Sequence, residues 1–390
     1  MPLQICALAF VACVIYPYVG YPIILLLWAK CRGQPVARKT GFTPSVSLVV
    51  AAYNEQASIA RCLEELTDLI AVSGLQGEVI LVSDGSTDGT AAIARAHAPN
   101  RVKLIELFAN VGKAAALDQG CAAARHEIIV FADVRQRWAK DALALLLENF
   151  ADPAVGAASG DLVIEAPAAE ITHSVGLYWR YEKWLRRLES RVDSTVGVTG
   201  ATCAVRRHLF GPIPPGTVLD DVYWPLLVAM QGFRVVHDER AHAYDHFAQG
   251  AYSEFRRKVR TLSGNFQLAA RLPAALLPWR NRIWFQFVSH KICRLLVPWA
   301  LAGALITTAL LTEPVYRVAF WIQVSAYLLG LAGLHRSVRQ RLRLASVAAS
   351  FLMLNAAAWF AFWIWVSGKT SKSWNKVRYT RPVGQRQPTI

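Results

Sequence analysis

The chain has 390 residues, of which 54% are hydrophobic, and its mean hydropathy is +0.29. It carries 42 Lys and Arg against 27 Asp and Glu, a formal net charge of +15. This composition excludes an ordinary soluble enzyme and indicates an integral membrane protein whose positive charge faces anionic lipids or anionic substrates. Zinc-finger spacings and basic aromatic RNA-binding signatures are missing from the sequence, so we expect no nucleic-acid partner.

The first apolar segment, residues 3–28, contains no charged side chain and is long enough to cross a bilayer. No basic residue precedes it, whereas Lys30, Arg32 and Arg38 follow it. A cleavable signal peptide has the opposite charge pattern. We therefore predict that residues 1–30 are an uncleaved anchor in a bacterial-type inner or plasma membrane, with the next domain in the cytoplasm.

Residues 44–270 have the pattern of an α/β domain. Four apolar runs each end in polar residues, and helical patterns separate them: VSLVVAAYNE, EVILVSDGSTDGT, RVKLIELFANVGK and EIIVFADVRQ. Such an alternation predicts a parallel sheet covered on both faces. Ligands of these sheets bind beyond the carboxyl ends of the strands, where Glu55, Asp84 and Asp133 are expected to meet, with Lys113 nearby. The structural alternatives are a plain turn and helix cap for DGSTDGT and a helix start for Asp133.

The C-terminal third contains three more charge-free apolar stretches, which predict about three transmembrane helices within residues 295–366. The residues just before them, 283–294, mix aromatic side chains with His290, Lys291 and Arg294. This mixture predicts a helix that lies in the membrane interface.

The tail, residues 367–390, is basic. Three crossings after a cytoplasmic domain would place it outside, against the preference of basic segments for the cytoplasm. The number of crossings and the side of the tail therefore stay open.

Four segments carry a resemblance to a known family. SLVVAAYNE, VSDGSTDGT, NVGKAAALDQG and FAD follow one another at the spacing found in family 2 glycosyltransferases. The flanking spans resemble the membrane-embedded branch that includes hyaluronan, chitin, poly-N-acetylglucosamine and cellulose synthases. The resemblance implies an α/β protein: a Rossmann-like GT-A nucleotide-diphospho-sugar transferase domain with a mostly parallel sheet, flanked by transmembrane helices.

The resemblance implies roles for the donor side. Tyr53 and Glu55 would border the nucleotide, Asp84 would bind its uracil–ribose portion, and Lys113 would lie near the diphosphate.

The same resemblance implies a metal. Asp133 matches the first acid of the family's DxD motif, which binds a divalent cation on the diphosphate, so Mg²⁺ or Mn²⁺ is the expected cofactor. Arg135 replaces the second acid, so water or the diphosphate would complete the metal shell. Arg135 would itself contact phosphate oxygens or form a surface salt bridge.

The stretch TVLDDVYW places two acids at a predicted helix start. Asp221 matches the last acid of the family's (T/E)(E/D)D element and would be the general base, which takes the acceptor proton as the anomeric centre inverts. Asp220 would orient Asp221 or raise its pKa through like-charge repulsion. The alternative is that both acids only cap the helix.

The stretch EFRRKVRTLSGNFQ lies where the synthases have QxxRW. Arg260 aligns with the Arg of that motif, Arg257 replaces its Gln, and Thr261 replaces its Trp. Arg257 and Arg260 would stabilise the leaving diphosphate, or the segment would be a basic helix on lipid headgroups. The missing Trp leaves polymerisation open.

The region between the two half-sites shapes the acceptor pocket in the family. By resemblance, the acceptor-side candidates are Trp179, Gly200, Ala201, Thr202 and Cys203. An aromatic stripe at helical spacing is more often core, which is the alternative for Trp179.

The sequence therefore predicts an inverting glycosyltransferase that moves a sugar from a UDP donor to a polysaccharide or lipid-linked acceptor at the membrane, by processive or single addition. The alternative from another class is a non-catalytic nucleotide-sugar-binding membrane protein. Acids retained at Asp84, Asp133 and Asp221 favour the enzyme. A transporter is disfavoured because the apolar spans carry no charge.

Overall fold

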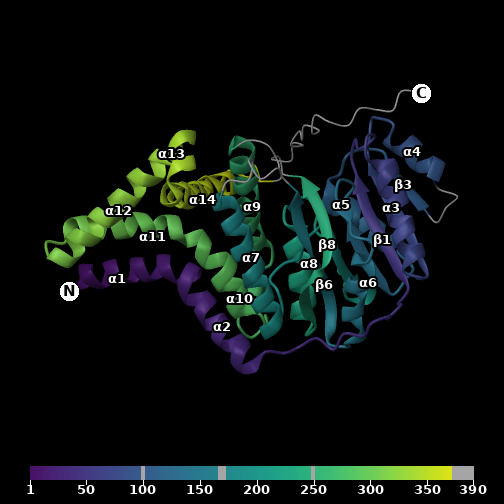
Figure 1. The fold of residues 1–390 in the computed structure, drawn as a ribbon, viewed down its shortest axis with the longest axis horizontal. Coiled ribbons are helices and arrows are strands. Elements are labelled where there is room, and N and C mark those ends of the chain that lie inside the picture. The colour runs from purple at the N-terminus through teal and green to yellow at the C-terminus, as the bar shows by residue number, and fades with distance from the viewer. Residues whose placement is uncertain (98–101, 166–172, 247–250, 371–390) are drawn as a thin grey trace.

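The computed structural model describes residues 1–97, 102–165, 173–246 and 251–370, so the end of the basic tail, 371–390, lies outside the described residues. A sheet domain occupies one side, and a group of helices projects from it on the other (Figure 1). The chain begins in the projecting part with α1 (Pro2–Ile15), the π-helical turn η1 (Tyr16–Gly20) and α2 (Tyr21–Arg32).

The described strands form one eight-stranded sheet in the order β3-β2-β1-β4-β7-β6-β8-β5. Their bounds, in that order, are Val102–Leu107, Gly77–Asp84, Val46–Ala52, Ile128–Ala132, Thr202–Arg206, Val155–Glu165, Arg234–His246 and Arg137–Trp138. β3, β2, β1 and β4 are mutually parallel, which confirms the predicted strands. Beyond β4 the sheet is mixed: β7 pairs antiparallel with both β4 and β6, β8 lies parallel to β6, and β5 pairs antiparallel with β8.

Helices cover both faces of the sheet. Successive side chains of a central strand, which point to opposite faces, are therefore buried. Leu48 and Val50 of β1 pack on the side of α3 (Ile59–Val72) and α6 (Ala142–Glu148). Val49 packs on the opposite side with α5 (Lys113–Ala123) and α8 (Asp220–Met230). The near-continuous apolar runs of the sequence are therefore the signature of a doubly covered sheet. The shorter α4 (Thr90–His97) follows β2.

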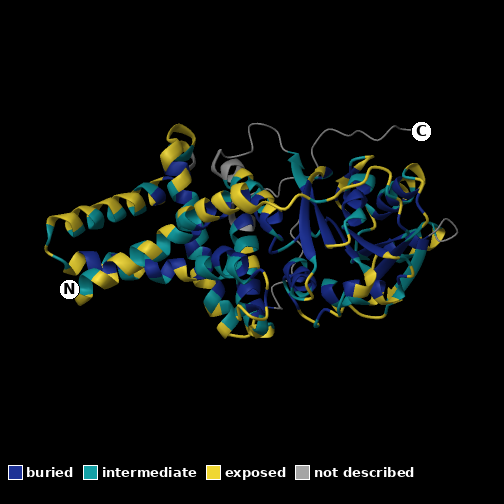
Figure 2. Cartoon of the chain, turned by 90° about the horizontal axis from the view of Figure 1, so that it is seen from below, coloured by how far each residue is buried: buried dark blue, intermediate teal, exposed yellow. Residues whose placement is uncertain are grey.

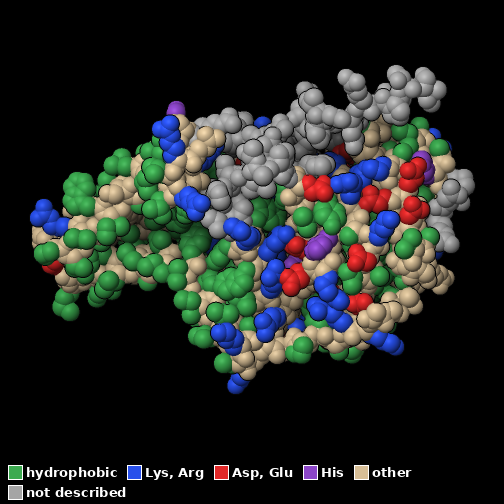
Figure 3. Space-filling model, viewed as in Figure 1, with side chains coloured by type: hydrophobic (Ala, Val, Ile, Leu, Met, Phe, Trp, Pro, Cys, Tyr) green, Lys and Arg blue, Asp and Glu red, His purple; other side chains and the backbone are tan. Residues whose placement is uncertain are grey.

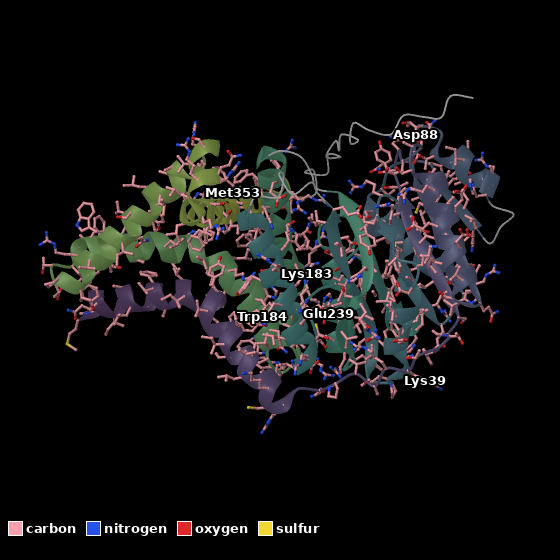
Figure 4. All side chains as sticks on the ribbon, viewed as in Figure 1. Lys39, Asp88, Lys183, Trp184, Glu239 and Met353 are labelled. Carbon is pink, nitrogen blue, oxygen red and sulfur yellow. The ribbon has the colours of Figure 1, made fainter. Side chains whose placement is uncertain are left out.

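The helix α7 (His173–Val192) lies between the sheet and the projecting helices (Figure 1). Figure 4 labels Lys183 and Trp184 on this border. After α9 (Ala251–Arg271) and η4 (Pro273–Leu276) the chain enters the projecting part. Its elements are α10 (Trp284–Phe287), the π-helical turn η5 (Val288–Ile292), α11 (Cys293–Leu310), α12 (Pro314–Ala332), α13 (Arg336–Arg341) and α14 (Arg343–Val366).

Four of the described helical segments are long and apolar enough to cross a membrane: Pro2–Arg32, Trp284–Leu310, Pro314–Ala332 and Arg343–Val366. The strands are buried, whereas α1 and α12 expose much of their surface (Figure 2). Hydrophobic side chains cover the projecting helices, and Lys and Arg gather on the sheet domain and along its border with them (Figure 3).

At residues 283–294 the structure has α10 and η5, which run directly into α11, so these residues begin the candidate span Trp284–Leu310. Their place in the membrane interface stays a prediction. η5 lies beside η1, where the hydroxyl oxygens of Tyr16 and Ser289 are 2.7 Å apart. Both spans therefore carry a π-helical turn where they approach the sheet domain, a feature frequent at functional sites.

Candidate active site

The loops after β1 and β2 are joined by hydrogen bonds. The backbone N–H of Asn54 donates to Ser86 Oγ (3.1 Å), and that of Thr87 donates to Asn54 Oδ1 (2.7 Å). The N–H of Glu55 donates to Thr90 Oγ1 (2.8 Å). Asn54 adopts a left-handed conformation with φ 53°. The turn-and-cap alternative for DGSTDGT therefore holds locally, and the turn also fixes the Tyr53–Glu55 loop at the strand edge.

Asp84, at the end of β2, is 3% exposed. Its two carboxylate oxygens accept the backbone N–H groups of Val111 (2.7 Å) and Gly112 (2.9 Å). A Cβ on the next residue, Gly85, would lie 2.4 Å from the carbonyl carbon of Ala109, so only glycine allows this approach. Asp84 therefore holds the loop that leads into α5, and a nucleotide contact for it stays a prediction.

Lys113, the first residue of α5, reaches the end of β4. Its Nζ donates to Asp133 Oδ1 at 2.7 Å, and both side chains are only partly exposed. The loop after Asp133 is held by Arg61, whose Nη2 donates to the carbonyls of Val134 (3.0 Å) and Arg135 (3.2 Å). The side chain of Arg135 is exposed at the rim.

Asp220 and Asp221 begin α8, as the sequence predicts, and the positive end of the helix dipole favours acids there. Gly200 lies between them and the donor side: a Cβ on it would be 3.5 Å from Asp221 Cβ and 3.9 Å from Lys113 Nζ. The structure thus brings Lys113, Asp133, Asp220 and Asp221 together around Gly200.

Burial and neighbouring charges shift the pKa values of Lys113, Asp220 and Asp221. Burial, and then the neighbouring Asp220 carboxylate, raise the pKa of Asp221 to about 6. Burial also raises the pKa of Asp220. Burial alone would lower the pKa of Lys113, but the carboxylates of Asp133 and Asp220 outweigh it and raise that pKa above its ordinary value. Lys113 is therefore a permanent cation, whereas Asp221 titrates near neutral pH.

The cations of α9 divide into two groups. Arg260 lies near enough to Asp220 for its charge to lower the pKa of that carboxyl. Arg257 instead forms an ion pair with Glu254, Nη2 to Oε2 at 2.8 Å, and Lys258 Nζ lies 4.6 Å from the centre of the Tyr178 ring. Of the two predicted leaving-group contacts, the structure brings Arg260 to the acids and engages Arg257 in a pair along its own helix.

Three of the acceptor-side candidates lie at the start of β7 and are buried: Ala201, Thr202 and Cys203. They face the end of β4, where Thr202 pairs with Ala132 and Cys203 with Phe131. The charges of Lys113, Asp133, Asp220 and Asp221 all act on Cys203, so this strand end lies beside the charged group. Trp179 lies partly exposed on α7.

Sequence reasoning missed two cations on the membrane side of Asp221, Arg186 of α7 and Lys291 of η5. Their charges lower the pKa of Asp221. The Nη1 of Arg186 donates to Thr199 Oγ1 at 3.2 Å, next to Gly200. Lys291 was visible as a charge within an apolar stretch, whereas no local pattern distinguishes Arg186 among the other basic residues of its helix.

Within the part of the chain that the structure describes, no group of three His, Cys, Asp or Glu side chains could hold a metal ion. Asp133 could supply one carboxylate, of which one oxygen already accepts Lys113. A Mg²⁺ or Mn²⁺ ion bound through one carboxylate, phosphate oxygens and water fits this donor set.

The family model described as "Glycosyl transferase family 2" matches residues 47–211. A poly-beta-1,6-N-acetyl-D-glucosamine synthase of Staphylococcus aureus is 32% identical over 118 residues, which cover 30% of this chain and 28% of that protein. Its counterpart in Staphylococcus epidermidis is 30% identical over 142 residues, 36% of this chain and 32% of that protein. The matches thus span about a third of these relatives' length.

Among solved structures, the fold is similar to that of the mannosyltransferase PcManGT from Pyrobaculum calidifontis in complex with GDP-Man and Mn²⁺, with a TM-score of 0.71 and 23% identity. The likeness covers 94% of this chain and 99% of that one, helices included. Residues 47–211 therefore match the model of this family, and the chain has a GT-A fold joined to helices that are long and apolar enough to cross a membrane.

Proposed function

We propose that the chain is a membrane-embedded, metal-dependent inverting glycosyltransferase that moves a sugar from a nucleotide donor to a polysaccharide or lipid-linked acceptor. One observation carries the proposal: the donor-side pair Lys113–Asp133 and the acid pair Asp220–Asp221 meet around Gly200. A transferase of this kind needs a cationic end for the diphosphate and a carboxylate at the opposite end for the acceptor.

The proposed reaction follows from this layout. The acceptor hydroxyl gives its proton to Asp221 while its oxygen bonds to C1 of the sugar. The bond from C1 to the diphosphate oxygen breaks on the opposite face, and the nucleoside diphosphate leaves. With its pKa near 6, Asp221 is ionised at neutral pH and still basic enough to take a proton. The charges of Lys113 and Arg260 both act on Asp220, and these two cations would offset the charge that develops on the leaving group.

Asp133 would hold the divalent cation, which neutralises diphosphate charge when bound. Lys113 shares the same carboxylate and would remain beside the phosphates. Support for the metal comes from this single accessible carboxylate and from the Mn²⁺ with which the similar mannosyltransferase is in complex.

We propose a UDP-sugar as the donor, in line with the resemblance to poly-N-acetylglucosamine synthases. The GDP-Man in the similar mannosyltransferase complex makes GDP-sugars the necessary comparison. We also propose that the sheet domain faces the cytoplasm, because Lys30, Arg32 and Arg38 follow the first span.

A donor screen on the full-length protein in detergent tests the proposal. UDP- and GDP-sugars would be supplied with Mn²⁺, or with EDTA, and release of the nucleoside diphosphate measured. We expect release with one nucleotide class, in the presence of metal only. Donor binding without release from any of them would favour the non-catalytic alternative.

A further inference from the structure

Two cations near Asp221, Lys291 of η5 and Arg186 of α7, form no ion pair at contact distance among the described residues. Among the described residues, Lys291 has no hydrogen-bond or ion-pair partner, and Arg186 has one neutral partner, Thr199 Oγ1. The positive charges of both side chains stabilise the ionised form of Asp221, and the two cations are close enough to each other for their charges to repel. Both side chains are partly exposed, so a ligand can reach them.

The charge of Lys291 acts on the nearby acids Glu182 and Glu189, but their carboxylate oxygens are hydrogen-bonded to other groups. Glu182 already binds Arg294 Nη1 (2.6 Å) and His290 Nε2 (3.1 Å). Glu189 already binds His290 Nδ1 (2.7 Å) and accepts the hydroxyl of Tyr21 (2.8 Å). Lys291 is therefore a half-buried ammonium group without a hydrogen-bonded partner among the described residues, which is costly unless an anion supplies one.

The places of Lys291 and Arg186 in the fold indicate which kind of anion would bind them. Lys291 belongs to the span Trp284–Leu310, and Arg186 belongs to α7, the helix between that span and the sheet. Two cations from different elements suit a group with several oxygens, such as a phosphate. A phosphate at the end of a membrane span lies at the level of lipid headgroups.

Resting on the proposed function, we propose that Lys291 and Arg186 bind a phosphate or diphosphate of the acceptor, and that the acceptor is a sugar linked through this group to a membrane lipid. The bound phosphate places the sugar hydroxyl against Asp221. That hydroxyl loses its proton to Asp221 as its oxygen bonds to donor C1, and the acceptor's own phosphate linkage stays intact. The site then has a cation at each end, Lys113 for the donor diphosphate and Lys291 with Arg186 for the acceptor phosphate.

Binding to the full-length protein in detergent tests the proposal. The donor side would be filled with saturating nucleoside diphosphate and Mn²⁺, and calorimetry would compare farnesyl diphosphate, farnesol and inorganic pyrophosphate. We expect farnesyl diphosphate to bind more tightly than the other two. Lys291→Gln and Arg186→Ala should each weaken it by roughly 10-fold or more, the loss expected for one charge-assisted hydrogen bond. Lys291→Arg should restore most of the affinity.

The matched control is Lys30→Ala, which removes an exposed lysine at the end of another membrane span and should leave the affinity unchanged. Equal affinity for farnesol and farnesyl diphosphate, or an unchanged affinity in Lys291→Gln, would overturn the phosphate site. Pyrophosphate that binds as tightly as farnesyl diphosphate would overturn the lipid assignment. Because the readout is acceptor-side binding, its failure is distinct from failure of the donor screen, which would overturn the glycosyltransferase proposal itself.

Discussion

Two groups of partly or fully buried charges in the described part of the molecule differ in how their acids titrate. The site cluster consists of Lys113, Asp133, Asp220 and Asp221, so acids outnumber cations three to one. There burial raises the pKa values of both Asp220 and Asp221, and a neighbouring carboxylate adds to it, Asp133 for Asp220 and Asp220 for Asp221.

The anchor cluster consists of Glu182 and Glu189 of α7, His290 and Arg294 of the membrane span, and Tyr21 of α2. Burial alone would raise the pKa of Glu182, but Arg294 and His290 outweigh it and hold that pKa well below its ordinary range. Burial also opposes ionisation of Glu189, and His290 outweighs it.

The comparison shows that burial opposes ionisation in both clusters, and that the neighbouring charges decide whether this effect is overcome. In the site cluster burial and the neighbouring carboxylates outweigh the nearby cations, so Asp221 can take a proton near pH 6. In the anchor cluster both acids are hydrogen-bonded to His290, and Glu182 also to Arg294, and these contacts join the span Trp284–Leu310 to α7. The sheet domain and the apolar helices therefore meet through Glu182 and Glu189, whose pKa values are lowered. We assign catalysis to Asp220 and Asp221, whose pKa values are raised.

The largest expected effect is at Asp133. If this carboxylate is the main protein ligand of the cation, Asp133→Ala should abolish turnover, and EDTA should do the same to the wild-type enzyme. The measurement is nucleoside diphosphate release with and without added Mn²⁺. Full turnover in EDTA would reject the metal assignment.

The next effect is at Asp221. Asp221→Asn keeps the shape of the side chain and removes the base, so the rate should fall by about 10²–10⁴-fold, the usual range for general acid–base catalysis. Donor affinity should change little because this side chain faces the acceptor. Weaker nucleotide binding with intact turnover would place Asp221 on the donor side instead.

A smaller loss is expected at Arg260, whose charge reaches Asp220. An interaction that strengthens as the diphosphate leaves shows mainly in kcat, so Arg260→Ala should lower kcat by roughly 10²-fold. Arg256→Ala on the same helix is the control, since this side chain is exposed. If both variants keep wild-type kcat in detergent, the segment is a lipid-facing helix.

Substitutions in the anchor cluster should lower the free energy of unfolding. Glu182→Gln leaves Arg294 and His290 without their shared carboxylate and should cost about 3–5 kcal/mol of unfolding free energy, the usual cost of breaking a buried pair. Glu239→Gln, which breaks the exposed pair with Arg187, should cost about 1 kcal/mol or less. Thermal unfolding in detergent would measure both, and equal losses would contradict the comparison.

The pH dependence of that difference has a defined sign. The pKa of Glu182 is lowered on folding, so its contribution is complete above its ordinary value of 4.5 and is lost as the pH falls through the folded value. The stability gap between wild type and Glu182→Gln should therefore narrow in acid.

The sequence predicted the donor half of the site because each strand end carries a local motif. β1, β2 and β4 are near-continuous apolar runs, and Asp84 and Asp133 end two of them. α8 likewise begins at the predicted acids, Asp220 and Asp221. Local pattern and strand order were sufficient for this half.

The membrane-side half depends on contacts between distant segments, which no local pattern encodes. His290 bridges two glutamates more than a hundred residues earlier, through both ring nitrogens. The sequence shows His290 only as one polar residue near an apolar stretch, and its partners could not be named from it. The antiparallel pairings of β7 likewise follow from the return of the chain past α7 and not from strand composition.

The most direct test of Asp221 as the general base is the pH dependence of kcat/KM for the acceptor, measured in wild type and in Asp220→Asn. An ionised Asp221 is the active form, so wild-type activity should fall as the pH drops below about 6. Asp220→Asn removes the neighbouring negative charge that helps to raise the pKa of Asp221, so the same limb should move to lower pH. A limb that stays near pH 6 in Asp220→Asn, or a wild-type profile without an acidic limb, would contradict the account.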